Sequence, residues 1–304
     1  MNYPRILAAV SQTLWAMQPE KIRAMLEFLR FQAAGGKFTP DEVAARIHPS
    51  REKAVARREG AVAVLPLHGV MSHRMNMFSA ISGGTSVELF QQQFRQAMAD
   101  ESVKAVVIEA DTPGGSVDMT PELSREIYDA RGGKPIVLQV STLAASAGYL
   151  VGSSADEIVV TPSGEVGSIG VYAVHEDVSR MLEAEGRTPT LISAGKYKVE
   201  GNPFAPLSDE ARAAIQQSVD AFYDMFIAAV ARNRAVDEDV VRNGFGEGRT
   251  VLADQAVRQG MADRVATLDE TLARFGVSRR PAPRNTAATP RLNLARRKLD
   301  LIAQ

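Results

Sequence analysis

The chain has 304 residues, 45% of them hydrophobic, so it is long enough to bury the core of one or two domains. Its formal net charge of -1 gives no general attraction to nucleic acid or to an acidic membrane. The absence of cysteine excludes disulfides, thiolate metal sites and a cysteine nucleophile, and the four histidines lack metal-ligand spacing. We therefore expect neither a metal nor another cofactor.

Residues 1–59 predict a helical leader that ends in a charged hinge. The residues that recur at near-helical spacing are Trp15, Ile22, Met25, Leu26 and Leu29. Charged residues interrupt the apolar stretches, so we expect neither a membrane anchor nor an export signal. The run Arg51–Glu59 is interpreted as a hinge open to self-cleavage or, more simply, as a solvated helix face.

Residues 60–276 alternate between short apolar strands and helical stretches. The expected elements are Val62–Leu67, Val87–Met98, Val103–Glu109, Pro121–Ala130, Pro135–Val140, a helix near Ala145–Ser154, Glu157–Thr161, Ile169–Val174, Glu176–Glu185 and Thr188–Ser193. This alternation predicts an α/β fold with a largely parallel sheet covered by helices. Functional residues are then expected beyond the carboxyl ends of strands.

Three segments that follow strands carry residues suited to acyl transfer. Ser146, within Ala145-Ser-Ala-Gly148, stands where a helix with free N–H groups begins. The glycines of Pro113-Gly-Gly115 can direct N–H groups at an oxyanion. Lys196-Tyr-Lys198 follows another expected strand, and a lysine in a dry pocket can act as a neutral base. Each segment alone also fits an ordinary turn or a solvated surface.

Taken together, four segments resemble the signatures of the S49 peptidase family, the signal peptide peptidase A-like serine proteases. They are Asp111–Ser116, Ala145–Tyr149, Gly167–Val171 and Ala194–Lys198. Lys198–Phe204 is most similar to the bacteriophage head-maturation branch of the family. The resemblance implies a ClpP/crotonase-like fold and a serine endopeptidase with a Ser–Lys dyad.

The resemblance also implies a role for each residue of the site. Ser146 would be the nucleophile and Lys198 the general base, whereas Lys196 would be solvated. The implied oxyanion-hole donors are the backbone N–H groups of Gly114 or Gly115 and of Ala147. Gly167-Ser-Ile-Gly170 would pack beside the site, with Ser168 at most hydrogen-bonded to the lysine amine.

The implied substrate is a protein or peptide: the phage scaffold, the portal or the protease itself, in the host cytoplasm or the procapsid. Phage head or scaffold proteins are the expected partners, and neither nucleic acid nor membrane is. In soluble single-unit relatives the serine and lysine come from neighbouring protomers. The resemblance therefore implies a homo-oligomeric ring.

Two alternatives stay open. A Clp- or crotonase-type hydrolase would use a Ser–His–Asp triad, for which His175, downstream of the serine, is the candidate. A non-catalytic structural protein of the capsid is the other alternative, and it would not need both Ser146 and Lys198.

The C-terminal part predicts a long helix and a tail. Ser208 is the expected N-cap of this helix, whose apolar stripe predicts a core or subunit interface. The stripe consists of Ala211, Ile215, Val219, Phe222, Phe226 and Val230. Residues 277–304 predict a flexible basic tail, because their Pro-, Arg- and Thr-rich composition cannot build a core.

Overall fold

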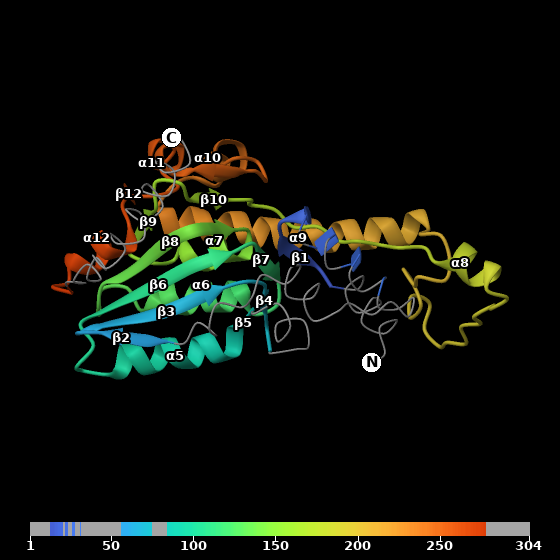
Figure 1. Cartoon of the computed structure of the whole chain (residues 1–304). Helices are drawn as coiled ribbons and strands as arrows, with labels where there is room; N and C mark the ends of the chain where they lie inside the picture. The colour runs from blue at the N-terminus through green and yellow to red at the C-terminus, as the bar shows by residue number, and fades with distance from the viewer. Residues whose placement is uncertain are drawn as a thin grey trace, which may run out of the picture.

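The structure, a computed structural model, describes residues 13–20, 22–23, 26–27, 31, 56–74 and 84–277. Its strands are β1 (Trp15–Met17), β2 (Arg57–Glu59), β3 (Val62–His68), β4 (Met71–Ser72), β5 (Thr85–Ser86), β6 (Ala105–Thr112), β7 (Gly114–Ser116), β8 (Ile136–Ala145), β9 (Glu157–Val160), β10 (Glu165–Gly167), β11 (Thr250–Leu252) and β12 (Arg264–Val265). Its helices are α5 (Val87–Ala99), α6 (Thr120–Asp129), α7 (Ala147–Gly152), α8 (Ser179–Ala184), α9 (Asp209–Arg234), α10 (Glu238–Gly244), α11 (Ala253–Arg258) and α12 (Leu268–Ala273). Figure 1 shows one layered body, from which a segment that begins with α8 projects. We call this segment, residues 179–208, the arm.

The main sheet is largely parallel. Its strand order is β11-β10-β8-β6-β3-β2, with β9 beside β8 and β12 beside β9. Among the described strands of this sheet, only the edge strands β2 and β11 are antiparallel to their neighbours. Parallel neighbours need crossover connections, which the helices α5, α6 and α7 supply. The predicted α/β fold with a largely parallel sheet is confirmed.

The main sheet is buried on both faces. On one face, Leu65 and Ile108 pack in the larger core together with residues of α5, α6, α7 and α9. On the other face, Val64 and Val107 pack under Leu272 of α12. Because successive strand residues point to opposite faces, strands buried on both faces have the continuous apolar sequences from which they were predicted.

A smaller sheet, of order β1-β7-β4-β5, begins just beyond β6. Its strand β7 contains the two glycines, and it pairs antiparallel with β1 and parallel with β4. A methyl group on Gly115 would lie 1.9 Å from the Met71 carbonyl oxygen, so only glycine allows this close approach of the two backbones. The Pro-Gly-Gly segment is therefore part of a sheet as well as a turn.

The described part of the predicted leader differs from the expected helix. Trp15 lies in strand β1, whereas Ile22 and Leu26 are helical and buried as predicted. Residues 57–59 of the expected hinge form strand β2, where Arg57 pairs with Glu109 at 2.8 Å. Of the other leader residues, Met25, Leu29 and residues 51–55 lie outside the described residues.

Two expected strands do not form. Residues 169–174 have no strand, because the chain leaves β10 at Gly167 and Ser168, whose φ values are +116° and +53°. Residues 188–193 have no strand partner within the described part of the chain and are exposed on the arm. The tail from residue 278 onward lies outside the described residues.

The long helix α9 begins at the predicted cap, where the Ser208 hydroxyl accepts a hydrogen bond from the Ala211 N–H at 3.2 Å. One face of its C-terminal half is buried, including Phe226 and Val230, but Ile215 and Val219 in its N-terminal half are only half-buried. That half extends toward the arm (Figure 1). No helix among the described residues has the length and apolarity needed to cross a bilayer.

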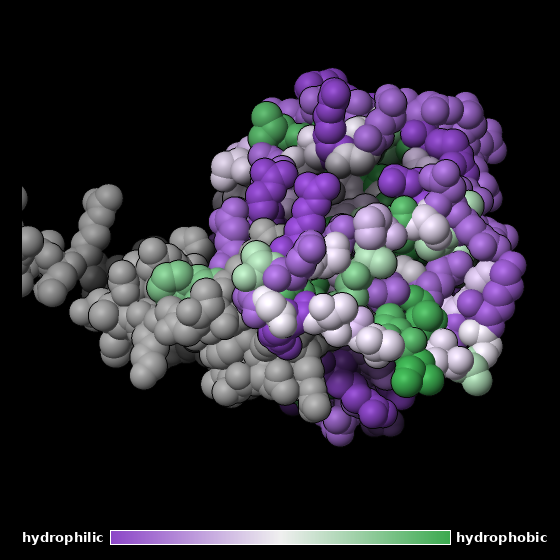
Figure 2. Space-filling view, turned by 90° about the vertical axis from the view of Figure 1, so that its right-hand side faces the viewer, coloured by the Kyte–Doolittle hydropathy of each residue, from purple (hydrophilic) through white to green (hydrophobic). Residues whose placement is uncertain are grey.

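The arm exposes apolar side chains that a monomer in water would normally bury. Ile192 is 95% exposed, and the large apolar residues Met181, Leu191, Tyr197 and Phe204 are exposed as well. Figure 2 faces the side from which the arm projects and shows apolar residues among hydrophilic ones. Exposed apolar surface of this kind is typical of a protein–protein contact.

Candidate active site

Ser146 stands at the turn from β8 into α7, as predicted. Its φ of 55° and ψ of -120° lie in a region that residues with a side chain avoid, at a cost of about 1–3 kcal/mol. Its N–H donates to the Gly167 carbonyl at 2.7 Å. Its hydroxyl makes a long hydrogen bond, 3.4 Å, to the Gly170 carbonyl. The surrounding backbone therefore holds this serine in a strained conformation.

Two glycines let α7 pack directly on the sheet. A methyl group on Gly148 would lie 2.3 Å from Thr112 Cγ2, and one on Gly152 would lie 2.4 Å from Leu138 Cδ2. The small residues after Ser146 therefore have a packing role, because a larger side chain would push the serine turn off β6 and β8.

Polar side chains from distant segments hold the other end of α7. The Arg131 guanidinium donates to the carbonyls of Ser153, Ser154 and Ala155 at 2.6–3.1 Å, and the Asn233 amide donates to Ser153 Oγ at 2.9 Å. A cation at a helix C-terminus is favourable, since the last carbonyls lack intrahelical partners. Sequence reasoning missed these two residues, because no local motif marks them.

The glycine strand lies against the serine. A methyl group on Gly114, whose φ is +98°, would lie 2.9 Å from Ser146 Cβ. The Gly114 N–H already donates to Thr112 Oγ1 at 3.1 Å, so Gly115 is the better oxyanion donor of the two. Ala147 is the first residue of α7, and its N–H therefore has no intrahelical partner. The structure thus brings the predicted loop and the predicted nucleophile together.

Lys198 is not at this site in the single chain. It is exposed, in a turn where its N–H donates to the Gly195 carbonyl at 3.2 Å. Within the described residues, no hydrogen bond joins its side chain to Ser146. Figure 1 shows residues 186–208 on the projecting arm and α7 in the body. One chain alone therefore does not assemble the predicted dyad.

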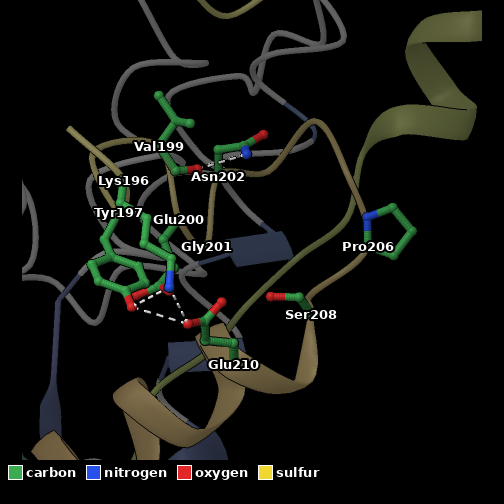
Figure 3. A pocket seen from close by; sticks show the side chains of 9 residues that line it. All are labelled: Lys196, Tyr197, Val199, Glu200, Gly201, Asn202, Pro206, Ser208 and Glu210. Atoms are coloured by element: carbon green, nitrogen blue, oxygen red, sulfur yellow. Dashed lines mark hydrogen bonds and ion pairs between the residues drawn. The ribbon is translucent and has the colours of Figure 1, made fainter. Parts of the chain in front are cut away.

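Lys196 is engaged elsewhere on the arm. Its Nζ lies 2.6 Å from Tyr197 Oη and 3.0 Å from Glu210 Oε1 (Figure 3). These hydrogen bonds to Tyr197 and Glu210 raise the pKa of Lys196. The three side chains line a pocket of about 260 Å³ to which Ser146 does not contribute. Lys196 is thus a solvated, protonated residue and a poor candidate for a base.

The structure does not assemble the alternative triad. His175 Nε2 lies 3.2 Å from the Asn202 carbonyl oxygen, and among the described residues no hydrogen bond joins it to Ser146. The second serine of the motifs, Ser168, is buried, and its N–H donates to the Arg249 carbonyl at 2.8 Å. Its backbone therefore fixes the segment beside Ser146.

Comparison with known proteins places this site in a family. Peptidase family S49 matches residues 129–279, a range that contains both Ser146 and Lys198. The head-tail preconnector protein GP5 of Enterobacteria phage P21 is 31% identical over 245 residues, which cover 80% of this chain and 48% of that protein. The capsid assembly protease C of Escherichia phage lambda is 31% identical over 211 residues, or 69% of this chain and 48% of the relative. The chain thus spans about half the length of these relatives.

Among solved structures, a 1510-N membrane protease specific for a stomatin homolog, from Pyrococcus horikoshii, aligns with a TM-score of 0.42 and 15% identity. The alignment covers 70% of this chain and 77% of that one. The match to the family and the two phage relatives all include the serine turn and the lysine of the arm. We conclude that the chain belongs to peptidase family S49.

Proposed function

We propose that the chain is a serine endopeptidase in which Ser146 is the nucleophile and Lys198 the general base. The observation that carries the proposal is the strained backbone of Ser146 beside Gly114. Strain of this size persists only where the surrounding structure enforces it, and it is concentrated at functional sites. The catalytic unit is proposed to span residues 60–276.

The proposed reaction is acyl transfer to the serine followed by hydrolysis. The neutral amine of Lys198 accepts the Ser146 proton as Oγ attacks the scissile carbonyl carbon. The N–H groups of Gly115 and Ala147 stabilise the oxyanion of the tetrahedral intermediate. The lysine then protonates the leaving amine, and water hydrolyses the acyl-enzyme with the same lysine as base. Gly114 shapes the loop, since its own N–H is bonded to Thr112.

Lys198 is proposed to act on Ser146 of a neighbouring protomer. The exposed apolar residues of the arm, including Ile192, support a contact with another copy of the chain. Removal of a lysine from water at such a contact favours its neutral form. Because the contact joins two different surfaces, it must close into a ring to avoid a filament. Proteolysis would then begin only after assembly.

The substrates are proposed to be phage head proteins: the scaffold, the portal or the chain itself, in the procapsid or the host cytoplasm. Support comes from the two phage relatives, one of which is named as a capsid assembly protease. Mass spectrometry of co-expressed head proteins, with wild-type chain and with Ser146→Ala, tests this. Cleavage products that require Ser146 are expected, and identical patterns would contradict the assignment.

The nucleophile is tested with a matched pair of serine variants. Ser146→Ala should abolish peptide hydrolysis, whereas Ser168→Ala, which removes a nearby buried hydroxyl, should retain most of it. His175→Ala should also retain activity, because His175 contacts the Asn202 carbonyl instead of the serine. An inactive His175→Ala with intact fold would favour the triad. An assembled wild-type ring with no hydrolysis would favour a structural role.

A further inference from the structure

The chain's own segment Leu14–Gln18 lies as an extended strand beside the glycine loop. On one edge, β1 pairs antiparallel with β7. On its other edge, the Trp15 N–H donates to the Tyr172 carbonyl at 2.9 Å, and the Tyr172 N–H donates to the Trp15 carbonyl at 3.0 Å. The segment is therefore bound on both edges, as an extended peptide that is added to a sheet is bound.

The register places the Ala16 carbonyl at the proposed oxyanion hole. Ala16 lies opposite Gly115. The neighbouring hydrogen bonds run from the Gln18 N–H to the Pro113 carbonyl at 3.0 Å and from the Val117 N–H to the Leu14 carbonyl at 3.3 Å. Bonded pairs recur at every second residue of an antiparallel ladder, so the Ala16–Gly115 pair is also of the bonded kind. The Gly115 N–H is thus directed at the Ala16 carbonyl oxygen.

The same carbonyl converges on the nucleophile. A methyl group on Gly114 would lie 2.2 Å from the Ala16 oxygen and 2.9 Å from Ser146 Cβ, so both groups lie on the same side of this glycine. Ala16 and Met17 are each only 2% exposed. The peptide bond presented to Ser146 is therefore the bond between Ala16 and Met17.

We propose that Leu14–Gln18 is an internal substrate strand, which occupies the groove of a peptide substrate and must leave before another peptide enters. The inference rests on the proposed function, because Ser146 and Gly115 define the groove. It gives the segment a regulatory role: in the isolated chain it competes with substrates for the site. The competitor is held in place by the two-sided backbone pairing and by burial of Trp15, which is 7% exposed.

The first test measures competition by binding, without catalysis. A fluorescently labelled peptide with the sequence of residues 13–18, and phenylalanine in place of Trp15, is titrated into full-length Ser146→Ala. A second protein carries Ala16→Pro in addition to Ser146→Ala and so lacks the N–H that faces Gly115. The control protein carries Ala16→Ser in addition to Ser146→Ala and keeps this N–H. We expect about tenfold tighter binding with Ala16→Pro and unchanged binding with Ala16→Ser, because an occupied site weakens apparent affinity. Equal affinities, or no binding to either chain, would overturn the inference.

The second test needs no change in the segment. Trp15 is the single tryptophan of the chain, so its fluorescence reports on the segment alone. Saturating peptide should shift the emission of full-length Ser146→Ala to longer wavelength as Trp15 enters water. Bound peptide with unchanged emission would show that the segment lies outside the groove. Failure of the proposed function is a different outcome: Ser146→Ala would retain hydrolytic activity while the expected binding results are still obtained.

Discussion

Replacement of Ser146 by glycine is predicted to give a more stable protein than replacement by alanine. The hydroxyl contributes little to stability, because its hydrogen bond to the Gly170 carbonyl is 3.4 Å long. Both variants lose that hydroxyl, and they differ only in the methyl group. At φ 55° and ψ -120° the methyl group carries the backbone strain of about 1–3 kcal/mol, which glycine does not have.

The entropy of the unfolded chain opposes this gain. Glycine in place of alanine costs about 0.5–1 kcal/mol in an ordinary helical position. The free energy of unfolding of Ser146→Gly should therefore exceed that of Ser146→Ala by about 0–2.5 kcal/mol. The assay is urea denaturation followed by circular dichroism. The matched control is Ala147→Gly, at the first position of α7, which should lose about 1 kcal/mol. The strain would be refuted if the free energy of unfolding of Ser146→Gly were lower than that of Ser146→Ala by as much as Ala147→Gly is lower than wild type.

Three further predictions concern the base, the packing of α7 and an ion pair. Lys198→Met should abolish hydrolysis in the assembled protein. Lys196→Met should retain most of it, because Lys196 of the arm is hydrogen-bonded to Glu210. Equal losses of initial rate in the two variants would contradict this. Gly148→Ala should lose about 1–3 kcal/mol in urea denaturation, because the added methyl group clashes with Thr112. Gly133→Ala should lose under about 0.5 kcal/mol, because its methyl group would lie 3.4 Å from the nearest atom, the Ala130 carbonyl oxygen. Burial favours the neutral acid of Asp263, but hydrogen bonds from Arg234 and from the Ile158 N–H hold the pKa of this carboxyl below its ordinary 3.8. The ionised carboxylate therefore stabilises the fold at neutral pH, and this contribution is lost as the pH falls through the pKa of the folded state. The stability gap between wild type and Asp263→Asn should therefore shrink below pH 3.8, and a gap independent of pH would contradict this.

Local sequence predicted the elements whose cause is local. The strand that ends before Ser146 and the small residues after it were recognisable, because a tight turn and close packing on Thr112 require them. The cap at Ser208 was predictable for the same reason, since its partner is three residues away.

Long-range pairing explains what the sequence did not predict. The spacing of Trp15 and Ile22 suits a helix, but Trp15 pairs with Ser116 and Tyr172, which lie about a hundred residues or more along the chain. The support that Arg131 gives to α7 likewise depends on the folded arrangement. The position of Lys198 on a projecting arm has no local signal, because the proposed contact is with another chain.

The central claim is that Ser146 and Lys198 of neighbouring protomers form one site. The most direct measurement mixes inactive Ser146→Ala chains with inactive Lys198→Ala chains, under conditions that allow subunit exchange, and follows peptide hydrolysis. With equal amounts and random assembly, about a quarter of the junctions carry both native residues, so about a quarter of the wild-type activity should return. Native mass spectrometry with differently tagged chains verifies that hybrid oligomers form. Hybrid oligomers that remain inactive would contradict the shared site.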